Sequence, residues 1–158
     1  MFYEINNKSP KIHPKVAFIS ENSILMGDVE IGKGVTIFDN VVLEGYPNKI
    51  IIGNYSNIQS GTVVHGLREY DTKIGKYCTI GHNSIIHGST IKDFCSIGMG
   101  STIMGKSILR TGCYVGANSL VTEKKEYPAC SLIYGVPAKI INPKVEGSIK
   151  SSREVAEG

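Results

Sequence analysis

The histidines of this chain are concentrated in one stretch. Three of the four, His65, His82 and His87, lie between Asn57 and His87, which reads N-I-Q-S-G-T-V-V-H, a short polar segment, and then I-G-K-Y-C-T-I-G-H-N-S-I-I-H. Neutral imidazole is the commonest protein ligand for transition metals. Three imidazoles on one ion leave a coordination position for solvent, which is typical of a catalytic zinc site. The fold must therefore bring the three side chains together if they act on a metal.

A six-residue repeat surrounds these histidines. Large aliphatic residues recur every six positions, interrupted by two short insertions and one skipped residue. A fixed short period of this kind predicts a solenoid. The repeated positions are Ile19, Leu25, Ile31, Ile37, Leu43, Ile52, Ile58, Val64, Ile74, Ile80, Ile86, Ile91, Ile97, Ile103, Leu109, Val115 and Val121.

Two other positions of the repeat predict the shape of each coil. Glycine or asparagine often stands three residues after the aliphatic residue, as at Gly61 and Asn83, and both tolerate the positive φ of a tight corner. The next position is small, and it is occupied by Cys78, Cys95 and Cys113 in successive coils. Because the chain has no C-x-x-C spacing, we interpret these thiols as core residues. We expect an all-β fold of short parallel strands joined by corners.

The repeat places two of the three histidines side by side. Val64 precedes His65, and Ile86 precedes His87. Ile86 lies three hexapeptides after Val64, so the two histidines fall in successive coils. We expect them to stack on one edge about 4.8 Å apart, the spacing of neighbouring strands. His82 lies near a different corner and cannot readily join the pair within one subunit. A trimer of solenoids packed side by side would bring His82 of one chain to the pair of the next.

The run N-I-Q-S-G-T-V-V-H, followed by I-G-H-N-S-I-I-H-G and I-G-M-G, resembles the gamma-class carbonic anhydrases of the hexapeptide-repeat superfamily, some of whose relatives are labelled ferripyochelin-binding proteins. The resemblance covers residues 19–141. It implies a left-handed parallel β-helix, and homotrimers that hold zinc or iron with three histidines at subunit interfaces. The matching ligands are His65, His82 and His87, with Zn²⁺, Fe²⁺ or Co²⁺ as the metal. Gln59 and Asn57 match side chains that hydrogen-bond near the metal-bound solvent.

The resemblance also implies an activity. It is that of a lyase in which a metal-bound hydroxide at a trimer interface converts CO₂ and water to bicarbonate and a proton. Some positions depart from the family pattern: Glu44 and Tyr46 stand where characterised members have an Arg and an Asp that join subunits. Acidic residues linked to proton transfer appear here as Pro47 and Arg68. Glu69 is the nearest carboxylate and the candidate for that role, and we expect slow hydration.

Two other functions remain open from the sequence. Acyltransferases share the repeats and the segment S-L-I-Y-G-V-P-A-K-I-I at residues 131–141, but they normally use one histidine as a general base without a metal. Some anhydrase-like relatives are acyl-CoA thioesterases that keep all three ligands. The missing acidic residues also fit a non-catalytic trimer that binds metal.

The remaining sequence predicts a simple organisation. Its 158 residues suit one domain, with a lead-in at residues 1–15, the β-helix and metal site at 16–141, and a short C-terminal α-helix and tail at 142–158. Asn142 and Pro143 suit the first positions of that helix. The net charge of +3 is small and the lysines are scattered, so we expect no nucleic-acid partner. No apolar run reaches membrane-spanning length, and we expect no membrane contact and a cytoplasmic protein.

Overall fold

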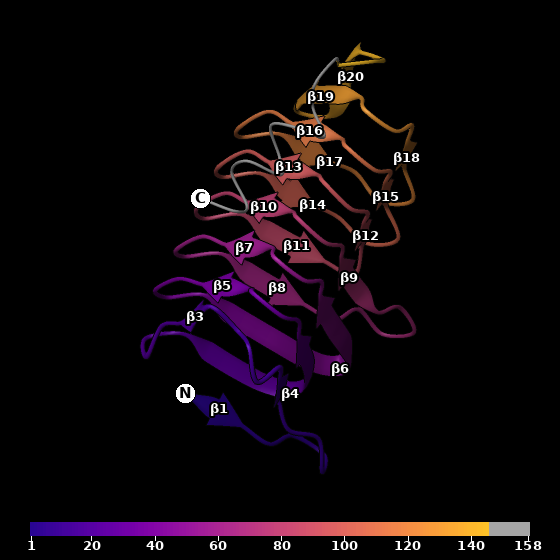
Figure 1. Ribbon diagram of the computed structural model, residues 1–158. Coiled ribbons are helices and arrows are strands. Elements are labelled where there is room, and N and C mark those ends of the chain that lie inside the picture. The colour runs from indigo at the N-terminus through magenta and orange to yellow at the C-terminus, as the bar shows by residue number, and fades with distance from the viewer. Residues whose placement is uncertain (146–158) are drawn as a thin grey trace.

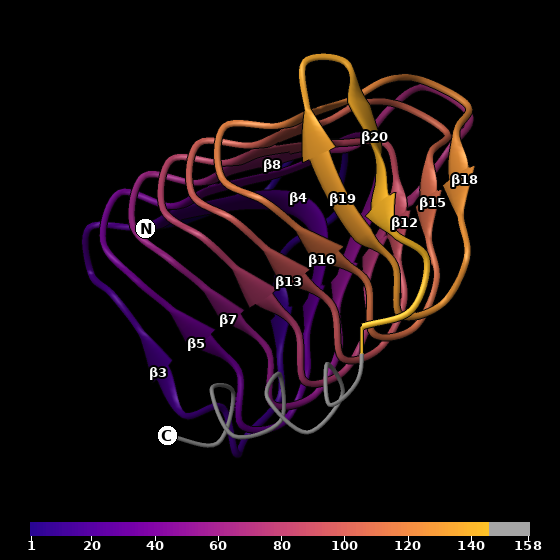
Figure 2. The same ribbon diagram turned by 90° about the horizontal axis from the view of Figure 1, so that it is seen from above.

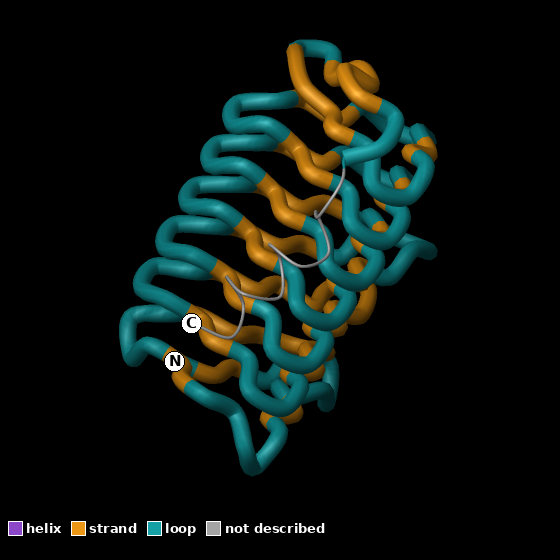
Figure 3. The backbone as a smooth tube through the Cα atoms, turned by 45° about the horizontal axis from the view of Figure 1, so that its top comes forward, coloured by secondary structure: helices purple, strands orange, loops and turns teal. Residues whose placement is uncertain are grey.

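The computed structural model describes residues 1–145, which form a solenoid of stacked coils (Figure 1). Seen from above, the coils overlay one another and enclose a narrow interior with three sides (Figure 2). The fold is the expected left-handed parallel β-helix. Residues 1–145 contain strands and loops but no α-helix (Figure 3). That part of the chain therefore has no helix with the length and hydrophobicity needed to cross a membrane.

Two sheets, one of twelve strands and one of eight, make the three faces of the solenoid. The first face consists of β4 (Ile24–Ile31), β6 (Val42–Ile52), β8 (Val63–His65), β11 (Ile85–His87), β14 (Thr102–Ile103) and β17 (Leu120–Val121). The long strands β4 and β6 continue into the second face, which adds β9 (Thr72–Ile74), β12 (Thr90–Ile91), β15 (Ile108–Leu109) and β18 (Glu126–Tyr127).

The eight-stranded sheet is the third face. It contains β3 (Phe18–Ile19), β5 (Thr36–Ile37), β7 (Asn57–Ile58), β10 (Thr79–Ile80), β13 (Ser96–Ile97), β16 (Tyr114–Val115), β19 (Leu132–Gly135) and β20 (Ala138–Asn142). All its pairings are parallel except that of β19 with β20. Near the N-terminus, β1 (Phe2–Tyr3) and β2 (Lys11–Ile12) pair in parallel with β4.

The predicted aliphatic positions form the core. From Leu25 to Val121 each of them is at most 3% exposed. The small positions beside them are also buried, and their polar atoms bond to the next coil. The Cys78 and Cys95 thiols, for example, donate to the carbonyls of Lys92 and Arg110 at 3.1 and 3.2 Å. Since side chains alternate along a strand, this packing fixes which neighbouring residues face outward.

The corners contain the predicted glycines and asparagines, and also three aromatic residues that the repeat did not predict. Gly61 and Asn83 have φ of 76° and 55°, as expected. Tyr55, Tyr77 and Phe94 adopt φ of 55–60° at one column of corners, a conformation that costs energy for a side chain with Cβ. Their rings stack with centroids 5.2 Å apart, and we infer that this stacking offsets part of the strain.

The last coil ends in a hairpin. β20 extends through Asn142, whose side-chain oxygen accepts a hydrogen bond from the Lys144 backbone N–H at 3.0 Å. The expected boundary at residue 142 therefore falls within a strand. Most of the helix expected over 142–158 lies outside the described residues.

Candidate metal site

His65 and His87 lie side by side at the ends of β8 and β11. The two strands pair in parallel with these residues directly opposite each other, and the ring centroids are 5.1 Å apart with the planes at 32°. Each histidine follows a fully buried residue, Val64 or Ile86, so each ring points outward from the first face. The predicted stacking of the pair is confirmed.

A buried hydroxyl ties together the chain segments that leave these two strands. Thr72 is fully buried, and its Oγ1 donates to the His65 carbonyl at 2.7 Å and accepts from the Gly88 N–H at 3.0 Å. The Gly88 N–H also bonds directly to the His65 carbonyl at 3.1 Å. The segment at residues 66–71 thus begins after His65 and ends at Thr72, whose hydroxyl holds the ends of both β8 and β11.

Leu67 of this insertion covers the surface next to His87. A Cβ placed on Gly88 would lie 2.2 Å from the Leu67 Cβ, and one on Gly105 would lie 2.8 Å from Leu67 Cδ2. The Leu67 side chain therefore occupies the space that a side chain at position 88 or 105 would need. Leu67 therefore lies beside the end of the His87 strand.

Glu44 extends the column of outward side chains by one coil. In the pairing of β6 with β8 it lies directly opposite His65, and its Oε2 is 3.8 Å from His65 Nε2. Sequence reasoning noted Glu44 only as a departure from the family pattern. The repeat itself could have found it, because Leu43 and Val64 occupy equivalent positions and the next residues are Glu44 and His65.

The side chains of this column suit a metal ion but do not complete a site in one chain. His65 Nδ1 is buried without a hydrogen-bond partner, although a buried ring nitrogen is normally satisfied. Two adjacent imidazoles are suitable donors for zinc, iron or cobalt. Among residues 1–145 of a single chain, no three His, Cys, Asp or Glu side chains converge to hold an ion. A metal would therefore need a further ligand from elsewhere.

His82 lies on the third face, as expected from its register. It is exposed and follows β10, whereas the histidine pair belongs to the first face. It lines a cavity of about 440 Å³ together with Gln59, Thr79, Gly81, Ser96, Ile97, Gly98, Met99, Tyr114 and Ala117. The described chain thus brings Gln59 to His82 and keeps both apart from His65 and His87.

Asn57 lies one coil below Thr79 on the same face. The pairing of β7 and β10 sets the two residues opposite each other, and Asn57 Nδ2 donates to Thr79 Oγ1 at 3.0 Å. Asn57 Oδ1 is buried without a partner. The amide is therefore held in place by one hydrogen bond and keeps one acceptor unused beside the cavity that contains Gln59 and His82.

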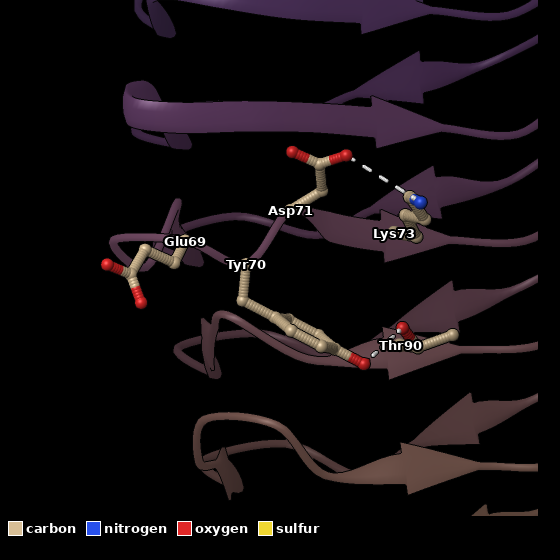
Figure 4. A pocket seen from close by; sticks show the side chains of 5 residues that line it. All are labelled: Glu69, Tyr70, Asp71, Lys73 and Thr90. Carbon is tan, nitrogen blue, oxygen red and sulfur yellow. Dashed lines mark hydrogen bonds and ion pairs between the residues drawn. The ribbon is translucent and has the colours of Figure 1, made fainter.

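Glu69 lies at a different cavity. It lines a space of about 280 Å³ with Tyr70, Asp71, Lys73 and Thr90 on the side of the second face, and none of the three histidines contributes to it (Figure 4). Lys73 pairs with Asp71 at 3.6 Å, and the hydroxyls of Tyr70 and Thr90 are 3.3 Å apart. The Glu69 carboxylate points away from these groups.

Comparison with known proteins identifies the family. No family model matches the chain. It is 44% identical over 138 residues to a protein of Methanocaldococcus jannaschii named "Probable carbonic anhydrase", and the match covers 87% of each chain. It is 34% identical over 149 residues to the mitochondrial gamma carbonic anhydrase 2 of Arabidopsis thaliana, and it spans 53% of that longer protein and 90% of itself.

Other similar proteins have different names. The carnitine operon protein CaiE of Escherichia coli K12 is 33% identical over 140 residues, covering 89% of this chain and 71% of CaiE. The crystal structure of a hexapeptide transferase family protein from Anaplasma phagocytophilum superposes with a TM-score of 0.93 at 35% identity, covering 99% of this chain and 92% of that one. Fold, histidine column and identity together show that this chain belongs to the gamma-class carbonic anhydrase-like proteins of the hexapeptide-repeat superfamily.

Proposed function

We propose that this protein is a metal-dependent hydratase of the carbonic anhydrase type, which converts CO₂ and water to bicarbonate and a proton. The observation that carries the proposal is the pairing of His65 with His87 on neighbouring strands, rings 5.1 Å apart. His82 of the partner subunit would complete the ligand set in a homotrimer, because His82 lies on another face of its own chain. The relatives named carbonic anhydrases support the same role.

Each group of residues has a role in this proposal. The three histidines would hold Zn²⁺, Fe²⁺ or Co²⁺, and such an ion lowers the pKa of water to about 7 and so supplies hydroxide near neutral pH. Gln59 lines the cavity beside His82 and would orient solvent or CO₂ through its amide. The unused acceptor of Asn57 would fix the hydrogen-bonding network behind it. We assign proton transfer to Glu69, the carboxylate nearest to His65 in the sequence.

The test is CO₂ hydration by stopped flow on protein purified without oxygen, with metal content measured on the same sample before and after chelation. We expect hydration that depends on metal, and loss of both hydration and metal in His87→Ala and in His82→Ala. A His82→Ala protein that kept its metal and its hydration would contradict the proposed ligand set.

Transfer or hydrolysis of an acyl group is the second candidate. It is favoured by the superposition on a hexapeptide transferase family protein and by the cavity of about 440 Å³ beside His82, since His82 could act there as a general base. Saturable binding of coenzyme A would support it, and activity without metal would select the transferase. A metal-loaded trimer that acts on neither CO₂ nor thioesters would instead be a binding protein.

A further inference from the structure

The second face contains a cavity that is separate from all three histidines. Its volume is about 260 Å³ and its lining is mostly apolar, just below the range of about 300–1,000 Å³ that is usual for small-molecule sites. It adjoins the cavity of Glu69, because Lys73 and Thr90 line both spaces; these two residues are drawn in Figure 4. We call this cavity the second-face recess.

The strand register explains the shape of the second-face recess. Ile51, Lys73 and Thr90 lie opposite one another on β6, β9 and β12. Each stands between two buried residues, so all three side chains point outward. Two residues further along the first two of these coils, Gly53 and Gly75 also line the recess, and neither has a side chain to fill it. Glycine backbone therefore forms part of the recess, beside the apolar side chain of Ile51.

Three exposed lysines surround this space. Lys73 and Lys76 come from one coil and Lys92 from the next. Lys73 is 3.6 Å from Asp71, but within residues 1–145 no carboxylate forms an ion pair with Lys76 or Lys92. The Asp93 carboxylate also lines the recess, and its Oδ1 accepts a hydrogen bond from the Lys76 backbone N–H at 2.8 Å. Ammonium groups thus outnumber carboxylates in the lining, and the lysine stems add apolar surface.

We propose that the second-face recess binds a small organic anion that carries an apolar group, such as a short-chain carboxylate. The apolar group would lie against Ile51 and the glycine backbone, and the anionic group would meet the ammonium groups of Lys76 and Lys92. The histidine pair lies on the first face and His82 on the third, so this site does not depend on the proposed metal centre. The inference therefore goes beyond the proposed function.

The test is a titration of the full-length, ¹⁵N-labelled protein with hexanoate, followed by NMR. The amide signals of Gly53 and Gly75 report on the recess, and that of Gly135, in the hairpin of β19 and β20, is the reference. We expect hexanoate to shift the first two signals saturably and to bind more weakly as salt is added. Hexylammonium has the wrong charge and inorganic phosphate has no apolar group, so each should bind at least about fivefold more weakly.

Two variants and a control locate the binding. Ile51→Trp should fill the recess and abolish the shifts. Lys92→Glu reverses one of its charges and should weaken hexanoate binding about fivefold. Lys125→Glu makes the same change of charge at an exposed residue outside the recess, and it should bind hexanoate like the unaltered protein.

The titration is run on metal-loaded protein and repeated after chelation, because a carboxylate can also bind a metal held by histidines. Equal shifts of Gly53 and Gly75 in both samples support a separate site on the second face. The proposal is overturned if the shifts disappear on chelation, if hexylammonium binds as well as hexanoate, or if Lys92→Glu and Lys125→Glu bind hexanoate equally well. None of these outcomes bears on CO₂ hydration, which is measured separately.

Discussion

At the scale of single residues, Thr72 decides how firmly the two histidine-bearing strands are joined. Its hydroxyl bonds the His65 carbonyl and the Gly88 N–H. In Thr72→Val the Gly88 N–H keeps its direct bond to His65, so we expect the free energy of unfolding to fall by only about 1–2 kcal/mol. We also expect metal affinity to fall several-fold, because the histidine backbone loses a support. Urea unfolding and chelator competition measure the two effects.

Ser131→Ala is the control for that prediction. Ser131 is also fully buried, and its hydroxyl donates to the Pro128 carbonyl at 2.8 Å, in the last coil and away from the histidines. It should lose similar stability while keeping metal affinity. Equal losses of affinity in both variants would mean that Thr72 acts only through general stability.

The four cysteines should differ in reactivity. Cys78, Cys95 and Cys113 are buried, whereas Cys130 is partly exposed. Contacts with the Cys113 and Cys78 thiols, together with burial, raise the pKa of Cys95 well above its usual value, so little of it is the reactive thiolate. Mass spectrometry after brief iodoacetamide treatment of the native protein should find Cys130 modified first. In Cys130→Ser the native protein should stay unmodified, and rapid labelling of Cys95 would contradict the packed core.

The histidine pair could be predicted from the sequence because a count of three hexapeptides, from Val64 to Ile86, was enough to place it. Glu44 obeys the same arithmetic, but a lone carboxylate after a core residue gives no chemical signal until its distance to His65 is known. His82 shows the opposite limit. Its face could be predicted, whereas its partner depends on contacts between chains, which the repeat of one chain does not encode.

At the scale of the coil, stacked glycines set how closely successive turns approach. A Cβ on Gly53 would lie 2.5 Å from the carbonyl carbon and oxygen of Gly75, which are rigid backbone atoms, whereas on Gly105 it would first meet the flexible end of Leu67. We therefore expect Gly53→Ala to lower the free energy of unfolding by about 1–3 kcal/mol and Gly105→Ala to cost clearly less. Denaturant unfolding of both variants measures the difference, and equal costs would contradict the close approach at Gly53.

The repeat predicts some of the corner residues but not all of them. Glycine and asparagine indicated the left-handed corners because they adopt positive φ at low cost. Tyr55 and Phe94 occupy equivalent corners with φ of 60°, and local propensity gives no hint of this. Their position depends on rings in neighbouring coils, so only the stacked structure explains it. The antiparallel hairpin of β19 and β20 likewise follows the end of the repeat and has no periodic signal.

At the scale of the whole molecule, the first face presents apolar side chains next to the histidine column. Ile85 is 46% exposed on β11, two residues before His87 and on the same outward side. On the third face, Met99 and Tyr114 are 57% and 47% exposed beside His82. Exposed apolar surface of this kind is typical of a subunit interface. The proposed trimer would cover both surfaces with each other and join the two parts of the metal site.

Ile85→Glu tests this arrangement. A carboxylate buried without a partner between subunits is costly, so we expect the variant to change from trimer to monomer in size-exclusion chromatography with light scattering. It should also lose metal, although all three histidines remain, because His82 of the partner subunit would no longer meet His65 and His87. Lys73→Glu, on the second face, makes a larger change of charge and should leave both trimer and metal intact. An Ile85→Glu monomer that still binds one metal per chain would show that each chain carries a complete site.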